Sequence, residues 1–365
     1  MRVAIVHDWL TGMRGGERCL EVFCGLFPEA DLFTLLHVKG SVSPAIERHR
    51  ITTSLVQSLP AAAERYRSYL PLFPWAVSRW DLSGYDLVLS SSHCVAKGIR
   101  TQRPGRHLCY CYTPARYAWD LFDEYFPSGP SRWAAEPIMS WFRRWDRDTS
   151  KGVGRFVAIS RCVADRIRRH YGRESDVIYP PVDCSAFSVS EDSGDYDLVV
   201  SALVPYKRVD LAVLAANRMK RRLVVVGTGP EMGRLKTLAG STIEFAGWQD
   251  DRALARWYSG CRSLWFPGLE DFGITPLEAM ASGRPVLAYA AGGALETVRG
   301  LEDPEPTGVF FKEQTVDALS EAVGTLERDR ARITPAACRA RAEAFDLPRF
   351  RTEIRAAVDR VMASG

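Results

Sequence analysis

Short apolar runs rich in β-branched residues recur along the chain and alternate with segments of helical periodicity. Runs of this kind, bounded by glycine, proline and polar residues, are typical of strands buried on both faces of a parallel sheet. The pattern predicts strands over residues 3–7, 86–89, 108–112, 156–159, 198–203, 223–227, 243–246, 264–266 and 286–288. Because strands and helices alternate, we expect an α/β protein with doubly wound parallel sheets.

The series of strands pauses at the Pro180-Pro181 pair and the polar stretch 188–195, and resumes at residue 197. A chain of 365 residues is longer than one hydrophobic core usually supports. We therefore predict two Rossmann-like domains, residues 1–182 and 183–347. The segment 348–365 holds an amphipathic helix over 350–362, which can pack back on the first domain.

Two doubly wound domains that face each other leave a cleft at the carboxyl ends of both sheets. Ligands of such sheets bind at those ends. We therefore expect the functional residues in the loops that follow strands.

Composition indicates the cellular compartment of the protein more clearly than its function. The chain is 46% hydrophobic and 25% charged, and its net charge of +4 is too small to indicate nucleic acid as a partner. Nine cysteines are scattered without a C-x-x-C pair, which is typical of a reduced cytoplasm. No apolar run has the length of a membrane span, and the start reads as a strand rather than a signal peptide. We expect a cytoplasmic protein.

The most informative motif is the turn from Glu270 to Glu278, which follows a predicted strand and opens a predicted helix. A helix N-terminus attracts anions, yet this one carries two carboxylates. A ligand with hydroxyls for the carboxylates and a phosphate for the backbone amides would satisfy both, and a nucleotide sugar has both parts. The alternative is a helix start that carries stabilising acids and binds nothing.

Three other loops that follow strands carry related signals. Lys207 and Arg208 stand at a helix start, where cations are unfavourable unless they face a ligand such as a diphosphate. Gly15-Gly16 and Gly292-Gly293 each precede a helix, and adjacent glycines permit close approach of a phosphate. Both pairs also fit plain tight turns.

These motifs together resemble the family-4 retaining glycosyltransferases of the GT-B fold. The resemblance rests on residues 266–286 with Gly292-Gly293, 203–210, Ser160 and 177–183, and it extends over essentially the whole chain. The stretches 85–98 and 109–120 are similar to bacterial surface-polysaccharide transferases, including O-antigen and exopolysaccharide mannosyltransferases.

The resemblance implies a donor site in the second domain and an acceptor site in the first. Glu270 would lie against the transferred sugar, Glu278 would hold the ribose hydroxyls, and Lys207 would neutralise the diphosphate. The remaining donor contacts implied are Arg208, Phe272, Gly273, Ile274, Thr275, Gly15 and Gly16. Candidate acceptor residues are His93, Lys97 and Arg116. Such enzymes normally need no metal and no cofactor beyond the donor, because cations and helix dipoles stabilise the developing charge.

Two positions depart from the family pattern. Ala202 stands where an arginine is common, so Arg208 would have to compensate. Tyr112 stands where a histidine usually contacts the donor sugar, and tyrosine is a poor proton acceptor near neutral pH. We assign Tyr112 to the catalytic set, with His93 or His107 as possible substitutes for the missing imidazole.

Aromatic and basic residues are interleaved in the first domain. The aromatic and aliphatic members lie between Tyr66 and Trp80 and between Trp133 and Trp145, and residues 132–173 hold eleven Arg or Lys against four Asp or Glu. This mixture suits an anionic membrane surface, although a core helix with a solvated basic face gives the same pattern. A lipid-linked acceptor would explain peripheral binding to the inner face of the cytoplasmic membrane.

The sequence thus favours a transferase that moves a hexose, mannose above others, from GDP-mannose or another nucleotide sugar to a lipid-linked oligosaccharide. The expected product is a surface polysaccharide or lipopolysaccharide. Two alternatives stay open, a GT-B-fold nucleotide-sugar epimerase and a non-catalytic subunit that binds a nucleotide sugar.

Overall fold

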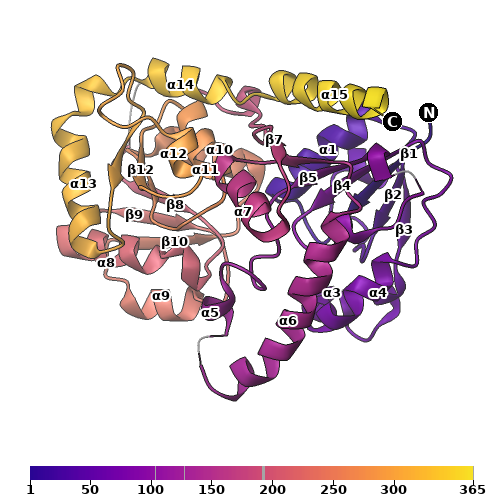
Figure 1. Cartoon of the computed structure of the whole chain (residues 1–365). Helices are drawn as coiled ribbons and strands as arrows, with labels where there is room; N and C mark the ends of the chain where they lie inside the picture. The colour runs from indigo at the N-terminus through magenta and orange to yellow at the C-terminus, as the bar shows by residue number, and fades with distance from the viewer. Residues whose placement is uncertain (103, 127, 191–193, 365) are drawn as a thin grey trace. The chain divides into compact units, whose positions relative to one another are not determined.

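A computed structural model describes the whole chain except residues 103, 127, 191–193 and 365. The chain divides into two compact units, residues 1–180 with 350–365 and residues 181–349 (Figure 1). The second unit begins at Pro181, whereas the predicted second domain begins at residue 183. The polar stretch 188–195 lies partly outside the described residues. From Phe350 onward the last helix, α15 (Leu347–Ser364), belongs to the first unit.

The first unit is built on one parallel sheet of seven strands in the order β3-β2-β1-β4-β5-β6-β7. The strands are β1 (Val3–His7), β2 (Asp31–Thr34), β3 (Arg50–Thr53), β4 (Leu87–Ser92), β5 (His107–Cys111), β6 (Arg155–Ala158) and β7 (Ser175–Val177). The longer helices are α1 (Gly15–Leu26), α6 (Pro130–Ser150), α7 (Arg161–Tyr171) and α15; the short ones are α2 (Pro44–Glu47), α3 (Ala62–Arg65), α4 (Phe73–Val77) and α5 (Phe122–Tyr125).

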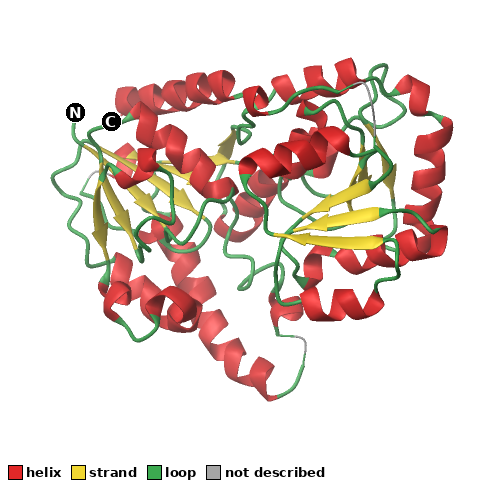
Figure 2. Cartoon of the chain, turned by 180° about the vertical axis from the view of Figure 1, so that it is seen from behind, coloured by secondary structure: helices red, strands yellow, loops and turns green. Residues whose placement is uncertain are grey.

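The second unit repeats this plan with six parallel strands in the order β10-β9-β8-β11-β12-β13 (Figure 2). The strands are β8 (Asp197–Val200), β9 (Leu223–Val226), β10 (Ile243–Gly247), β11 (Leu264–Phe266), β12 (Val286–Tyr289) and β13 (Gly308–Phe311). The helices are α8 (Val209–Met219), α9 (Met232–Leu238), α10 (Asp251–Gly260), α11 (Ile274–Ala281), α12 (Ala294–Thr297), α13 (Val316–Arg328) and α14 (Pro335–Glu343).

The strand order reverses once in each sheet. In the first sheet the chain winds outward from β1 through β2 to one side and from β4 to the other. In the second sheet β8 lies between β9 and β11 in the same way. Such a switch point opens a crevice at the carboxyl ends of the two strands that flank it. The loops after β1 and β4, and those after β8 and β11, are therefore the places for ligands.

The two-domain α/β fold predicted from the sequence is confirmed, and each of the nine predicted strands has a counterpart. Central strands such as β1 and β9 are buried along their whole length, which explains their unbroken apolar runs. The four strands that were missed are short, and β3 (Arg50–Thr53), β7 (Ser175–Val177) and β13 (Gly308–Phe311) lie at sheet edges. The edge strands β3 and β7 are only partly buried and carry polar residues, so their apolar signal is weak, whereas β2 and β13 are mostly buried and were missed because each is only four residues long.

Two general features bear on the setting. All nine cysteines are reduced thiols, and eight of them are buried. Within the described part of the chain, no helix is both long enough and apolar enough to cross a bilayer.

Candidate functional site

The ammonium of Lys207 forms an ion pair with Oε1 of Glu270. Lys207 ends a short 3-10 turn (Pro205–Lys207) after β8, and Glu270 lies in the loop after β11, so the pair spans the switch point of the second sheet. The two side chains are 14% and 20% exposed. Partial burial strengthens the pairing while both groups stay within reach of a ligand.

Arg208 adopts a left-handed conformation with φ of 49° and directly precedes α8. Such a conformation costs a non-glycine residue on the order of 1–3 kcal/mol and recurs at functional sites. The Arg208 guanidinium pairs with Oδ1 of Asp210 at 3.2 Å. Ala202, where the family commonly has an arginine, is exposed in the same loop. Because Arg208 is already paired with Asp210, it replaces that missing cation only in part.

The helix α11 begins at Ile274, and its N-cap residue is Gly273, whose φ of 90° favours glycine and which has no side chain to cap the helix. The first amide groups of a helix lack intrahelical acceptors and together attract anions. Phe272 and Gly273 are buried, whereas Ile274 and Thr275 are half-buried. The backbone at Ile274 and Thr275 is therefore the part of this turn that a ligand can approach.

Glu278 lies in the second turn of α11 and is held by a neighbouring helix. The hydroxyl of Tyr258, on α10, donates a hydrogen bond of 2.6 Å to Oε2 of Glu278. Burial, together with the nearby Glu278 carboxylate, raises the pKa of Tyr258 well above its usual value. Tyr258 therefore stays protonated and orients the carboxylate. No sequence signal distinguishes Tyr258 from any other core tyrosine of an amphipathic helix.

The glycine pair Gly292-Gly293 packs directly on the Glu270 turn. Gly292 has a φ of 62°, and the amide of Gly293 donates a 2.8 Å hydrogen bond to the carbonyl of Glu270. A Cβ at Gly293 would overlap the backbone of Phe272. The glycine pair therefore fixes the position of the Glu270 turn. This packing role differs from both roles considered from the sequence, a phosphate-binding loop and a plain tight turn.

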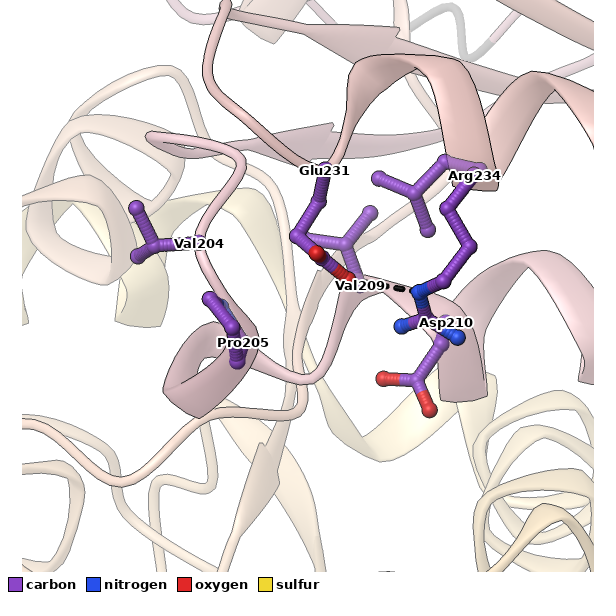
Figure 3. A pocket seen from close by; sticks show the side chains of 7 residues that line it. Val204, Pro205, Val209, Asp210, Glu231 and Arg234 are labelled. Atoms are coloured by element: carbon purple, nitrogen blue, oxygen red, sulfur yellow. Dashed lines mark hydrogen bonds and ion pairs between the residues drawn. The ribbon is translucent and has the colours of Figure 1, made fainter. Parts of the chain in front are cut away.

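The loop that carries Lys207 borders a small hollow, shown in Figure 3. Val204 and Pro205 approach it from one side, and Asp210, Glu231 and Arg234 from the other. Arg234 and Glu231 are joined by a 2.6 Å ion pair. Glu231 is thus paired with Arg234, and Asp210 with Arg208. Lys207 and Glu270 form a separate ion pair at the switch point.

In the first unit, the switch point is occupied by Asp8 and His93. The fully buried carboxylate of Asp8 accepts hydrogen bonds from the backbone amides of His93, Cys94, Val95 and Ala96, at 2.7–3.0 Å. Nδ1 of His93 lies 3.2 Å from Oδ2 of Asp8, which favours the tautomer with the proton on Nδ1. Burial lowers the pKa of His93, and Asp8 opposes that change. The sequence singled out His93 but not Asp8, which orients it.

Tyr112 lies directly after β5, and its hydroxyl is engaged within the protein. It donates a 2.8 Å hydrogen bond to the carbonyl of Gly16 and lies 2.9 Å from the hydroxyl of Ser91. Burial raises the pKa of Tyr112 well above its usual value. Tyr112 therefore holds the first turn of α1, where Gly15 and Gly16 lie, and cannot serve as a general base near neutral pH.

The structure places two of the residues considered for the site, Lys97 and His107, in the core. Lys97 is only 2% exposed, and its ammonium contacts the Asp146 carboxylate at 2.5 Å, so it belongs to the core and not to an acceptor site. His107 begins β5, at the opposite end from the ligand-binding edge, and is fully buried against Ser90. Burial lowers the pKa of His107 to about 4. His107 therefore cannot replace the missing imidazole, whereas Arg116 lies half-buried in the loop after β5.

Comparison with known proteins agrees with this geometry. Residues 29–186 match the family described as Glycosyltransferase Family 4, and residues 187–345 match the one described as Glycosyl transferases group 1. The chain is 40% identical over 143 residues to a GDP-mannose-dependent alpha-mannosyltransferase of Mycolicibacterium smegmatis, an alignment that covers 38% of this chain and 36% of the relative.

A second relative from the same organism is a GDP-mannose-dependent alpha-(1-6)-phosphatidylinositol monomannoside mannosyltransferase. It is 29% identical over 226 residues, which cover 53% of this chain and 58% of the relative. The chain thus aligns with less than two thirds of the length of either relative.

The fold is shared with solved structures at low sequence identity. The crystal structure of Anabaena HepE in complex with UDP has a TM-score of 0.74 at 16% identity, over 99% of this chain and 100% of that one. The two family matches are contiguous and together span residues 29–345. Because these two matches cover most of the chain, the chain belongs to the family-4 glycosyltransferases.

Proposed function

We propose that this protein transfers a hexose from a nucleotide diphosphate sugar to an acceptor hydroxyl, with retention of the anomeric configuration. The observation that carries the proposal is the Lys207–Glu270 ion pair at the switch point of the second sheet, close to the N-terminus of α11. A cation, a carboxylate and the backbone amides of a helix start in one place match the phosphates and hydroxyls of such a donor.

Each group then has a distinct role. On donor binding, Lys207 exchanges Glu270 for the diphosphate, and Glu270 accepts hydrogen bonds from hydroxyls of the transferred sugar. Glu278, oriented by Tyr258, binds the ribose hydroxyls. The amides at Ile274 and Thr275 face the sugar and phosphate oxygens.

During transfer, the bond between the anomeric carbon and the phosphate oxygen breaks while the acceptor oxygen bonds to the same face of the sugar. The acceptor proton passes to the departing diphosphate, so no side-chain base is required. Lys207 and the dipole of α11 stabilise the negative charge that develops on the diphosphate. These groups already supply positive charge, and we therefore expect no requirement for a metal ion or another cofactor.

The donor we favour is GDP-mannose, because both mycobacterial relatives are named as GDP-mannose-dependent mannosyltransferases. The acceptor we favour is a lipid-linked glycan in surface polysaccharide synthesis, and the phosphatidylinositol monomannoside in one relative's name supports a lipid substrate. Within the first unit, His93 and Arg116 are the proposed acceptor residues. Such an acceptor places the protein at the inner face of the cytoplasmic membrane.

The test is a transfer assay with GDP-mannose, UDP-glucose and UDP-N-acetylglucosamine, each offered with polyprenyl-diphosphate-linked sugars and with phosphatidylinositol mannosides. We expect one donor to give a product whose new bond, analysed by NMR, has the anomeric configuration of the donor. An inverted bond would contradict the proposed chemistry. Release of an epimer or of free nucleotide without acceptor would favour the epimerase alternative.

A further inference from the structure

The helix α6 (Pro130–Ser150) presents large apolar side chains to solvent along its first half. Trp133 is 82% exposed, Trp141 47% and Ile138 39%. Ala134, Ile138 and Trp141 follow an i, i+4, i+7 spacing and form one stripe, and Trp133 borders it. Figures 1 and 2 both show this half of α6 extending away from the sheet of the first unit.

A neighbouring stripe of α6, offset by one residue along the chain, anchors the helix to its own unit. Ala135, Met139 and Phe142 repeat the same spacing and are buried in the core of the first unit. The helix is therefore apolar on two sides, of which only one is used for packing. Contiguous apolar surface that remains in water marks an interaction site in soluble proteins.

The structure also sorts the aromatic residues that the sequence grouped together. Tyr66, Phe73 and Trp80 are core residues, and Trp145 packs against Gly98, so they do not take part in a surface. Trp75 is 54% exposed on α4, a helix whose end reaches a hollow that Trp145 also lines. The exposed aromatic side chains of this group thus lie on α6 and on α4.

The charges of α6 favour an anionic partner. The carboxylates of the helix are balanced by cations, since Glu136 pairs with Arg143, Asp146 with Lys97, and Asp148 with Lys151. Arg144 adds exposed positive charge in the turn that follows Trp141, whereas the Arg147 guanidinium donates to the carbonyl of His170 and lies over the ring of Trp119. An apolar stripe bordered by an exposed arginine, with little negative charge left to repel phosphates, is complementary to an anionic lipid headgroup region.

We propose that the face of α6 defined by Trp133, Ile138, Trp141 and Arg144 binds the interface of a bilayer that contains anionic lipid. Tryptophan suits this depth because its ring is apolar while its indole N–H remains hydrated. Arginine borders the same face and reaches the phosphates. This inference rests on the proposed function, in which the acceptor is lipid-linked, and adds the surface by which the protein would reach that lipid. Membrane binding can be measured without turnover.

The test is co-sedimentation of the full chain with vesicles of phosphatidylcholine alone and of phosphatidylcholine with 30% phosphatidylglycerol, at low and high salt. We expect binding to the anionic vesicles that weakens with salt. The double variant Trp133→Ser/Trp141→Ser should lose binding at least tenfold, and Arg144→Gln about fivefold, the factor equivalent to ~1 kcal/mol per basic residue. Trp248→Ser, which removes a 75% exposed tryptophan from the second unit, is the matched control and should bind like wild type.

Three outcomes would overturn the proposal: no binding of wild type at low salt, equal binding of the α6 double variant, or equal loss in the Trp248 control. Light scattering of the free protein supplies a further check, since dimerisation abolished by Trp133→Ser/Trp141→Ser would assign the face to a second copy of the chain. Melting temperatures of all variants exclude misfolding as the cause. Donor binding measured on the same samples separates failure here from failure of the proposed function.

Discussion

The ion pair between Lys207 and Glu270 joins the loops that follow β8 and β11, the two strands that flank the switch point of the second sheet. Gly268 lies against the backbone of Lys207, and Gly293 lies against the backbone of Phe272, so the two loops are held by close backbone packing. The pair is therefore placed before a donor arrives. Preorganised charge of this kind contributes most when charge develops in the transition state.

Replacement of Lys207 by alanine should lower turnover by about 10²–10³-fold, the range found when one charge-stabilising donor is removed from an active site. Donor affinity should fall less, because the helix start and Glu278 remain. Steady-state kinetics with a saturating acceptor separates the two effects. Lys236→Ala, at an exposed position on α9, is the control and should be neutral. Full turnover in Lys207→Ala would show that the diphosphate binds elsewhere.

Tyr258→Phe removes the hydroxyl that orients Glu278 and should weaken nucleotide binding by roughly tenfold or more, since hydrogen bonds to charged groups contribute about 1.5–3 kcal/mol. Calorimetric titration with the nucleoside diphosphate measures this. Tyr196→Phe is the matched control, because its hydroxyl donates to the carbonyl of Trp257 at 2.8 Å and not to Glu278. If both variants bind the nucleotide equally, Tyr258 has only a packing role.

Gly293→Ala should disturb the Glu270 turn. The added methyl group would overlap the backbone of Phe272, and overpacking of this kind costs about 1–3 kcal/mol of unfolding free energy. Because the Glu270 turn must shift to relieve the overlap, donor affinity should fall as well. Gly233→Ala adds a methyl group in open space on α9 and should stabilise the helix by about 0.5–1 kcal/mol. Unchanged stability and donor affinity in Gly293→Ala would contradict this role of the glycine.

The buried His107 should make stability depend on pH. Burial lowers its pKa from 6.5 to about 4 in the folded protein, so between these values the unfolded chain binds more protons. Its contribution is complete above pH ~6.5 and is lost as the pH falls toward 4, by ~3 kcal/mol for a change of about 2.5 units. Urea unfolding across this range should show a flatter profile for His107→Gln than for wild type. Parallel profiles would show that His107 is accessible to solvent protons.

A structural feature could be predicted from the sequence where residues close together in the chain carry its signal. Central strands such as β1 and β9 were predictable because burial on both faces leaves an unbroken apolar run, whereas β7 (Ser175–Val177) at a sheet edge leaves none. Lys207 and Glu270 could be expected near each other, since both follow strands of one parallel sheet and carboxyl ends share an edge.

Side-chain partners were not predictable in this way. Lys97 was predicted as an acceptor residue, but the fold places Asp146, which lies 49 residues further along the chain, against it. Asp8 and Tyr258 orient His93 and Glu278 from segments distant in sequence, and no local pattern marks either residue. Partner choice follows from tertiary packing, so it appears only with the fold.

The central claim is that the second unit binds a nucleotide diphosphate sugar through Glu270, Glu278 and Lys207. The most direct measurement is thermal unfolding of wild type and Glu278→Ala with a panel of nucleotide sugars, each tested up to high concentration. A ligand present at about a hundred times its dissociation constant stabilises the folded state by ~2.7 kcal/mol. We predict that one donor, which we expect to be GDP-mannose, selectively stabilises wild type. This stabilisation should be lost in Glu278→Ala. Equal stabilisation of both proteins, or no response of wild type to any nucleotide sugar, would contradict the claim.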